Sequence, residues 1–254
     1  MNQYLIKDDR FEYVEKGSGQ PLIVLHGLMG GLSNFQGVFQ ELPARGYRVI
    51  IPQLPIYEMP LLKTTVKEFA KYLHEFILYK ELKGVVLLGN SLGGHIGLLY
   101  TKNYPEFVKG LVITGSSGLY ENAMGDGYPK RGNYEFIKQK SEEVFYDPKV
   151  ATKEIVDEVF EAVNNRDKLV RTLAIAKSAI RHNMSKDLPH MKQPTAIIWG
   201  KNDIVTPPDV AREFHKLLPD SELSWIDQCG HAPMMEHPDR FNDILVQWLE
   251  NNNL

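Results

Sequence analysis

The chain contains one cysteine, Cys229, in 254 residues. A single cysteine excludes a disulfide within the chain, and so low a cysteine content is typical of proteins from reducing compartments, which predicts a cytoplasmic location. No cysteine-protease signature surrounds Cys229. We therefore interpret it as a small residue packed in a loop rather than as a nucleophile.

Strong charge and long apolar runs are also missing. The 29 basic and 32 acidic residues give a formal net charge of −3 without a dense basic cluster, so no nucleic acid partner is predicted. No stretch of about 18 apolar residues indicates a transmembrane helix. Residues 1–10 have neither the basic start nor the apolar core of a signal peptide. We expect no membrane partner, while the sequence leaves homodimer formation open.

Patterns for bound metals and nucleotides are absent as well. The eight histidines include no His-x-x-x-His pair, the spacing that places two metal ligands on one helix face. The dinucleotide-binding pattern Gly-x-Gly-x-x-Gly does not occur. The sequence therefore predicts neither a metal nor an organic cofactor.

What the chain does contain is an alternation of short apolar runs and amphipathic segments. The apolar runs predict strands at Phe11–Glu15, Leu22–Leu25, Val49–Ile51, Val85–Leu88, Leu111–Thr114, Ala196–Trp199 and Leu223–Ile226. The amphipathic segments predict helices at Val66–Ile77, Val210–Leu218 and Phe241–Leu249. Alternating strands and helices predict βαβ units around a mostly parallel sheet, an α/β fold. The short turn Gly17-Ser18-Gly19 predicts that the first strand starts an antiparallel hairpin.

This alternation stops between about Leu119 and Leu188. No strand is expected there, and helices are predicted near Tyr134–Tyr146, Lys153–Asn164 and Lys168–His182. We therefore predict a core made of residues 1–118 and 189–254. The helical insertion at 119–188 is expected to cap the carboxyl edge of the sheet, where ligand sites of α/β proteins lie.

One strand leads directly into a serine between two glycines. The apolar run Val85–Leu88 continues as Gly89-Asn90-Ser91-Leu92-Gly93, and a helical pattern follows. This is the Gly-x-Ser-x-Gly turn, in which glycines avoid backbone collisions and the serine hydroxyl stands at a helix N-terminus, where negative charge is favoured. Ser91 is the candidate nucleophile.

A serine hydroxyl needs a base, and the base needs an orienting acid. Asp203 follows the predicted strand Ala196–Trp199, and His231 follows the predicted strand Leu223–Ile226. Because the carboxyl ends of parallel strands meet at one edge of a sheet, we expect both side chains near Ser91. The order serine, acid, histidine is the one found in α/β-hydrolases.

Other residues compete for these two roles. Asp203 would alternatively do no more than cap its own turn. Asp227 is a rival acid, but it is too close to His231 along the chain to be the usual choice. His237 is interpreted as support for the helix that starts at Pro238, and His182 as a solvent-facing residue of the insertion.

Three segments together resemble the α/β-hydrolase fold family, of the broad esterase and lipase-like kind with a helical cap. They are Gly89–Gly93, Trp199–Asp203, and Gly230–Pro233 followed by Glu236–Pro238. The similarity extends from His26 to the final helix. It implies a mostly parallel sheet flanked by helices, with Ser91 as nucleophile, His231 as general base and acid, and Asp203 fixing the imidazole tautomer.

The resemblance also implies a hole for the oxyanion. One donor is the backbone amide of Leu92, directly after the nucleophile. The second is assigned to the amide of Leu28 in the loop His26–Gly31, with Met29 as a weaker candidate. His26 is interpreted as a structural hydrogen-bonding residue.

The predicted function is hydrolysis of a small-molecule carboxylic ester through an acyl-serine intermediate. The first alternative is a carbon–carbon bond hydrolase of vinylogous diketones, which Gly89-Asn90-Ser91 resembles. That subgroup usually has tryptophan where this chain has Ala232, and it needs a cap arginine, a role open to Arg166 or Arg171. The second alternative is a slow-turnover ligand receptor on the same fold.

Overall fold

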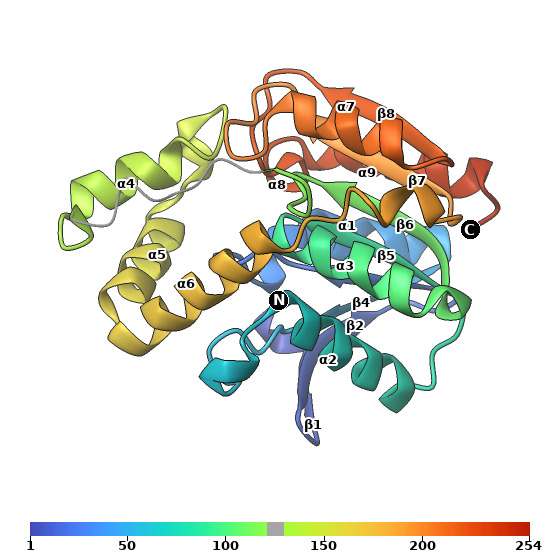
Figure 1. The fold of residues 1–254 in the computed structure, drawn as a ribbon, viewed down its shortest axis with the longest axis horizontal. Coiled ribbons are helices and arrows are strands. Elements are labelled where there is room, and N and C mark those ends of the chain that lie inside the picture. Colours follow the sequence, from blue (N-terminus) through green and yellow to red (C-terminus); the bar gives the residue numbers. More distant parts are fainter. Residues whose placement is uncertain (121–129) are drawn as a thin grey trace.

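An eight-stranded sheet forms the centre of the protein in a computed structural model that describes residues 1–120 and 130–254 (Figure 1). The strands are β1 (Leu5–Asp8), β2 (Phe11–Lys16), β3 (Gln20–Leu25), β4 (Tyr47–Pro52), β5 (Val85–Asn90), β6 (Val108–Thr114), β7 (Thr195–Gly200) and β8 (Ser221–Ile226). Their spatial order is β1-β2-β4-β3-β5-β6-β7-β8. The pairs β1–β2 and β2–β4 are antiparallel, and all other pairs are parallel. The predicted mostly parallel α/β sheet is confirmed.

All seven predicted strands are present, and β3 shows why the continuous apolar runs form central strands. Its side chains alternate between two hydrophobic cores, one on each face of the sheet. Ile23 and Leu25 belong to one core, and Leu22 and Val24 belong to the other. All four are fully buried. A strand covered on both faces has no polar face, which is why its sequence is apolar without alternation.

The hairpin predicted at Gly17-Ser18-Gly19 is wrong. β2 pairs with β4 and with β1, a strand that was not predicted. β1 and β2 are antiparallel and are joined by the turn Asp9-Arg10. β3 lies beyond β4 and pairs with β4 and β5. Because β3 is apolar on both faces, a central position buries more apolar surface than a place beside β2 would. β1 was not predicted because it lies at the sheet edge with three of its four residues exposed.

Helices cover both faces of the sheet. They are α1 (Gln36–Glu41), α2 (Val66–Tyr79), α3 (Leu92–Asn103), α4 (Tyr134–Glu142), α5 (Lys153–Asn164), α6 (Arg166–Arg181), α7 (Pro208–Leu217), α8 (Pro233–Glu236) and α9 (Pro238–Asn251). α2, α3 and α7 contribute to the core of Ile23, whereas α1 and α9 contribute to the core of Leu22. In the described part of the chain, no helix has both the length and the apolar character required to cross a bilayer.

Local signals explain where the helices begin. α2 starts after Thr65, whose hydroxyl accepts the N–H of Glu68 at 3.3 Å, satisfying a donor that has no partner inside the helix. α9 starts at Pro238, which suits a first helical position because its missing N–H would have no partner there. The predicted helices are confirmed to within a few residues at each end.

Between β6 and β7 the described residues form α4, α5 and α6 and contain no strand. Figure 1 shows these inserted helices standing away from the sheet at one side. α6 is joined to the core where the N–H of Val66 donates to Ser178 Oγ at 3.1 Å. Residues 121–129 of the predicted insertion at 119–188 lie outside the described part, and the division into core and cap stays a prediction.

Candidate active site

Ser91 occupies the turn between β5 and α3, as predicted. Its backbone has φ +53° and ψ −118°, a conformation that is strained for any residue with a side chain. Gly89 and Gly93 make the turn sterically feasible: a Cβ on Gly89 would lie 2.4 Å from the carbonyl carbon and oxygen of Gly93. The glycines are therefore required by close backbone approach, and the serine is held at the tip of a buried strand.

The strained backbone of Ser91 is fixed by hydrogen bonds on both sides. Its N–H donates to Thr114 O at 3.1 Å, at the end of β6. Its carbonyl oxygen accepts the N–H of His95 and the N–H of Ser117, each at 3.2 Å. The end of β6 with the chain that follows it, and the first turn of α3, thus hold the serine, which is how such strain persists in a folded protein.

Asp203 and His231 meet beside this turn. Asp203 Oδ2 lies 2.9 Å from His231 Nδ1, and the two residues are 3% and 7% exposed. Because a carboxylate only accepts hydrogen bonds, Nδ1 carries the proton in the neutral ring and Nε2 is left as an acceptor. The pair therefore presents an imidazole in the tautomer that a general base needs.

Asp203 also caps its own turn. Its Oδ1 accepts the N–H of Val205 at 2.8 Å and that of Thr206 at 2.9 Å. Its Oδ2 accepts the Thr206 hydroxyl at 2.8 Å in addition to His231. The cap fixes the carboxylate, and the fixed carboxylate orients the ring.

Asn90 links the serine turn to the histidine loop. Its Nδ2 donates to His231 O and to Thr114 O, both at 3.1 Å. The residue directly before Ser91 therefore holds the backbone of His231. Within the described residues, no hydrogen bond joins Ser91 Oγ to His231; such bonds are often loose without substrate and tighten when it binds.

The amides predicted to bind the oxyanion lie at the same place. Leu92 is the first residue of α3, so its N–H has no acceptor within the helix. The loop that carries Leu28 packs against the serine, since a Cβ on Gly27 would lie 3.3 Å from Ser91 Cβ. Among the residues that the structure describes, neither the Leu28 nor the Leu92 amide donates a hydrogen bond.

His26 holds that loop in place, as its structural interpretation requires. Nδ1 donates to Gly27 O at 2.9 Å, and Nε2 accepts the N–H of Leu54 at 3.1 Å. The side chain is fully buried, and this burial lowers the pKa of His26 to about 4. The ring stays neutral at any pH at which the protein would be assayed.

This shift predicts an acid-dependent loss of stability. Below about pH 6.5 an unfolded histidine binds a proton that folded His26 does not, so the free energy of unfolding falls by about 1.4 kcal/mol per pH unit until the folded pKa is reached. His26→Gln keeps an acceptor for Leu54 but does not titrate. Urea unfolding between about pH 4.5 and 7.5 is expected to show a shallower pH slope for this variant, and equal slopes would contradict the assignment.

Comparison with known proteins decides the family. A family model described as the alpha/beta hydrolase fold matches residues 20–238. The chain belongs to the α/β-hydrolase family. Its relatives are enzymes, and the chain is an α/β-hydrolase enzyme as the sequence predicted.

Two curated relatives of this α/β-hydrolase have different named activities. Lipase 1 of Psychrobacter immobilis is 29% identical over 94% of this chain and 80% of its own length. The 2-hydroxy-6-oxo-6-(2'-aminophenyl)hexa-2,4-dienoic acid hydrolase of Metapseudomonas resinovorans is 32% identical over 93% of this chain and 86% of its own. An alpha/beta hydrolase enzyme from the metagenome of lagoon sediments at Mar Chica, Morocco, has a crystal structure with a TM-score of 0.83 and 56% identity, covering 98% of this chain and 99% of its own.

Two rival residues of the hydrolase have other partners. Cys229 is fully buried, and burial raises the pKa of its thiol, so it remains protonated and is a poor nucleophile. Asp227 is an exposed carboxylate paired with Lys201 at 2.6 Å. Both arrangements agree with the interpretation that neither residue is catalytic.

The rival histidines lie in separate environments. His237 stands at the N-cap position of α9 without a capping side-chain hydrogen bond, and its Nε2 bonds Gln228 O at 2.9 Å instead. The interpretation of His182 as solvent-facing is wrong. Its Nδ1 lies 3.0 Å from Nε2 of His95, it is partly buried, and burial lowers its pKa. His95 was not identified from the sequence as a residue near the site, although it lies one helical turn after Ser91.

Arg171 is only partly exposed. Its side chain is 17% exposed, its Nε bonds Asp167 Oδ2 at 2.9 Å, and its Nη1 bonds the carbonyl of Met59. The guanidinium therefore joins α6 to the loop after β4. The Nε and Nη1 groups of Arg171 already donate to Asp167 and to Met59.

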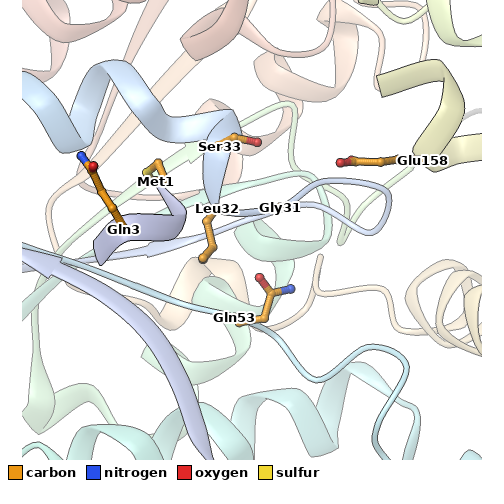
Figure 2. A pocket seen from close by; sticks show the side chains of 7 residues that line it. All are labelled: Met1, Gln3, Gly31, Leu32, Ser33, Gln53 and Glu158. Atoms are coloured by element: carbon orange, nitrogen blue, oxygen red, sulfur yellow. The ribbon is translucent and has the colours of Figure 1, made fainter. Parts of the chain in front are cut away.

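A cavity of about 690 Å³ lies next to the loop after β3. It is lined by Met1, Gln3, Gly31, Leu32, Ser33, Gln53 and Glu158. Figure 2 shows Glu158 of α5 extending toward the cavity from the side opposite Ser33. Ser91, Asp203 and His231 do not line it. No group of three or more potential metal ligands occurs among the described residues.

Proposed function

We propose that this α/β-hydrolase cleaves small carboxylic esters through an acyl-serine intermediate, with Ser91, His231 and Asp203 as its triad. The observation that carries the proposal is the buried hydrogen bond between Asp203 Oδ2 and His231 Nδ1, placed beside a serine in a strained strand-to-helix turn. The similarity to Lipase 1 adds support for ester hydrolysis.

The chemistry follows from the tautomer of His231. Nε2 accepts the proton of Ser91 while Oγ attacks the ester carbonyl, and Asp203 stabilises the imidazolium that forms. The amides of Leu28 and Leu92 receive the oxyanion, and each such donor contributes about 3 kcal/mol to transition-state stabilisation. His231 returns the proton to the leaving alcohol. Water then hydrolyses the acyl-serine by the same steps in reverse order.

We further propose that the predicted insertion at 119–188, of which the structure describes residues 119–120 and 130–188, serves as a cap. The chain that follows α4 contacts the loop of the base directly, because the N–H of His231 donates to Val144 O at 2.9 Å. A cap so placed would enclose a small-molecule substrate and select its acyl group. The single cysteine supports a cytoplasmic setting for this activity.

A second candidate is hydrolysis of a carbon–carbon bond in a vinylogous diketone, favoured by the 32% identity to the dienoic acid hydrolase. Two features argue against it. Ala232 follows His231 where the resembling subgroup usually has tryptophan. Arg171, one of the two arginines considered for a substrate carboxylate, already bonds Asp167 and Met59 O.

Both activities are tested by one pair of assays. We expect the protein to hydrolyse p-nitrophenyl esters in a series from acetate to octanoate, with an optimum that measures the acyl pocket. We expect turnover of a 2-hydroxy-6-oxohexa-2,4-dienoate to be at least about 100-fold lower in kcat/KM. The reverse ratio would establish the carbon–carbon hydrolase. A folded protein that binds these compounds without turnover would instead be a receptor.

A further inference from the structure

Glu236 ends α8 and its carboxylate binds two segments that are far apart in the chain. Oε1 accepts the N–H of Gly230 at 2.7 Å. Oε2 accepts the N–H of Tyr146 at 2.7 Å and that of Asp147 at 3.3 Å. A carboxylate offers about four acceptor sites, and hydrogen bonds to a charged acceptor are about twice as strong as neutral ones. Glu236 thus bridges the loop before His231 and the chain after α4.

The two segments are in direct backbone contact. A Cβ on Gly230 would lie 2.5 Å from Val144 O and 3.0 Å from Phe145 Cα, so only glycine allows this approach. The next residue, His231, donates its N–H to Val144 O at 2.9 Å. The inserted chain therefore forms one wall of the loop that carries the proposed base.

The backbone N–H, the carbonyl oxygen and Nδ1 of His231 each have a hydrogen-bond partner in the protein. Val144 accepts its N–H, Asn90 donates to its carbonyl, and Asp203 bonds Nδ1. Glu236 fastens the preceding residue and the segment that supplies Val144. A displacement of a reacting group by about 1 Å can lower the rate about 100-fold. These hydrogen bonds therefore determine how well His231 Nε2 is aligned with Ser91.

We propose that Glu236 is a positioning residue for His231, which it aligns by fastening the histidine loop to residues 144–147. The inference rests on the proposed function, in which His231 is the base. Glu236 acts through backbone amides, and it transmits the position of the inserted helices to the imidazole. This role also accounts for the glutamate in the segment Glu236–Pro238, which resembles the family but contains no member of the triad.

The test measures the reactivity of Ser91 itself. Diisopropyl fluorophosphate reacts when the serine oxygen bonds phosphorus, fluoride leaves and the base takes the proton, so its rate depends on alignment of serine and histidine rather than on ester binding. Glu236→Gln keeps the shape but replaces one acceptor with an NH₂ group that faces an N–H. We expect its inactivation rate constant and its kcat on p-nitrophenyl acetate to fall together by about 10- to 100-fold, with KM changed less than about threefold.

A matched variant separates positioning from general loosening. Glu143→Gln makes the same chemical change beside the same segment, but within the described ranges 1–120 and 130–254 the Glu143 carboxylate bonds only Lys140 and Gln139 of α4. We expect it to react within about twofold of wild type, and Glu236→Asp, which keeps the charge but is shorter, to be intermediate.

Each failure has a separate meaning. Glu236→Gln reacting at the wild-type rate, or Glu143→Gln slowed equally, would overturn the positioning role. Wild-type protein that does not react at Ser91 would contradict the proposed function instead. If Glu236→Gln fails to fold, the comparison of Glu236→Asp with Glu143→Gln carries the test.

Discussion

Ser91→Ala is expected to lower kcat for p-nitrophenyl ester hydrolysis by at least about 10⁴-fold, because the acyl-enzyme route ends when its nucleophile is removed. The loss should appear in kcat and kcat/KM alike, since the hydroxyl is used in the reaction rather than for binding. Steady-state kinetics on a p-nitrophenyl ester and a melting curve on the same preparation measure the effect.

The strained backbone supplies a control for this variant. Alanine retains a Cβ at φ +53°, whereas Ser91→Gly removes the strain, so the glycine variant is expected to melt at a higher temperature than the alanine variant while being equally inactive. Residual hydrolysis by Ser91→Ala above about a tenth of the wild-type rate would show that another group attacks the ester.

Asp203→Asn is expected to lower kcat by about 10⁴-fold with little change in stability, in line with the effect of this change in serine proteases. The amide oxygen in the place of Oδ1 still accepts the N–H groups of Val205 and Thr206, so the turn keeps its cap. The NH₂ group in the place of Oδ2 donates to His231 Nδ1. The ring proton must then move to Nε2, and Nε2 can no longer accept the proton of Ser91.

Thr206→Val is the control for that substitution. It removes the hydroxyl that donates to Asp203 Oδ2 but leaves the carboxylate opposite the imidazole. We expect a loss of about tenfold or less in kcat, measured on the same ester. Asp203→Asn retaining more than about a tenth of wild-type kcat would assign Asp203 to the turn alone.

The strands and the serine turn could be predicted because their signals are local. Val85–Leu88 is apolar because both faces of β5 are buried, and the glycines around Ser91 mark a close backbone approach within one turn. The hydrogen bond between Asp203 and His231 was also within reach of prediction. Both residues follow parallel strands, whose carboxyl ends meet at one edge of the sheet.

Features that depend on distant partners could not be predicted in this way. The pairing of β2 with β4 is determined by which strand buries more surface at the centre, and the turn after β2 contains no information on that competition. His182 is polar at a helix end, which is typical of solvent exposure, yet its Nδ1 lies 3.0 Å from Nε2 of His95 on α3. Glu236 belongs to a segment that resembles the family, but its amide partners Tyr146 and Asp147 lie about 90 residues away, so these contacts could not be predicted.

Direct detection of the acyl-enzyme tests whether Ser91 is the nucleophile. Protein mixed with p-nitrophenyl butyrate is quenched in acid within the first turnovers, and its intact mass and the mass of the peptide that contains Ser91 are determined. We expect a mass increase equal to one butyryl group, located on Ser91 and absent from Ser91→Ala. Ester turnover without an adduct, or an adduct on another residue, would contradict an acyl-serine mechanism at this site.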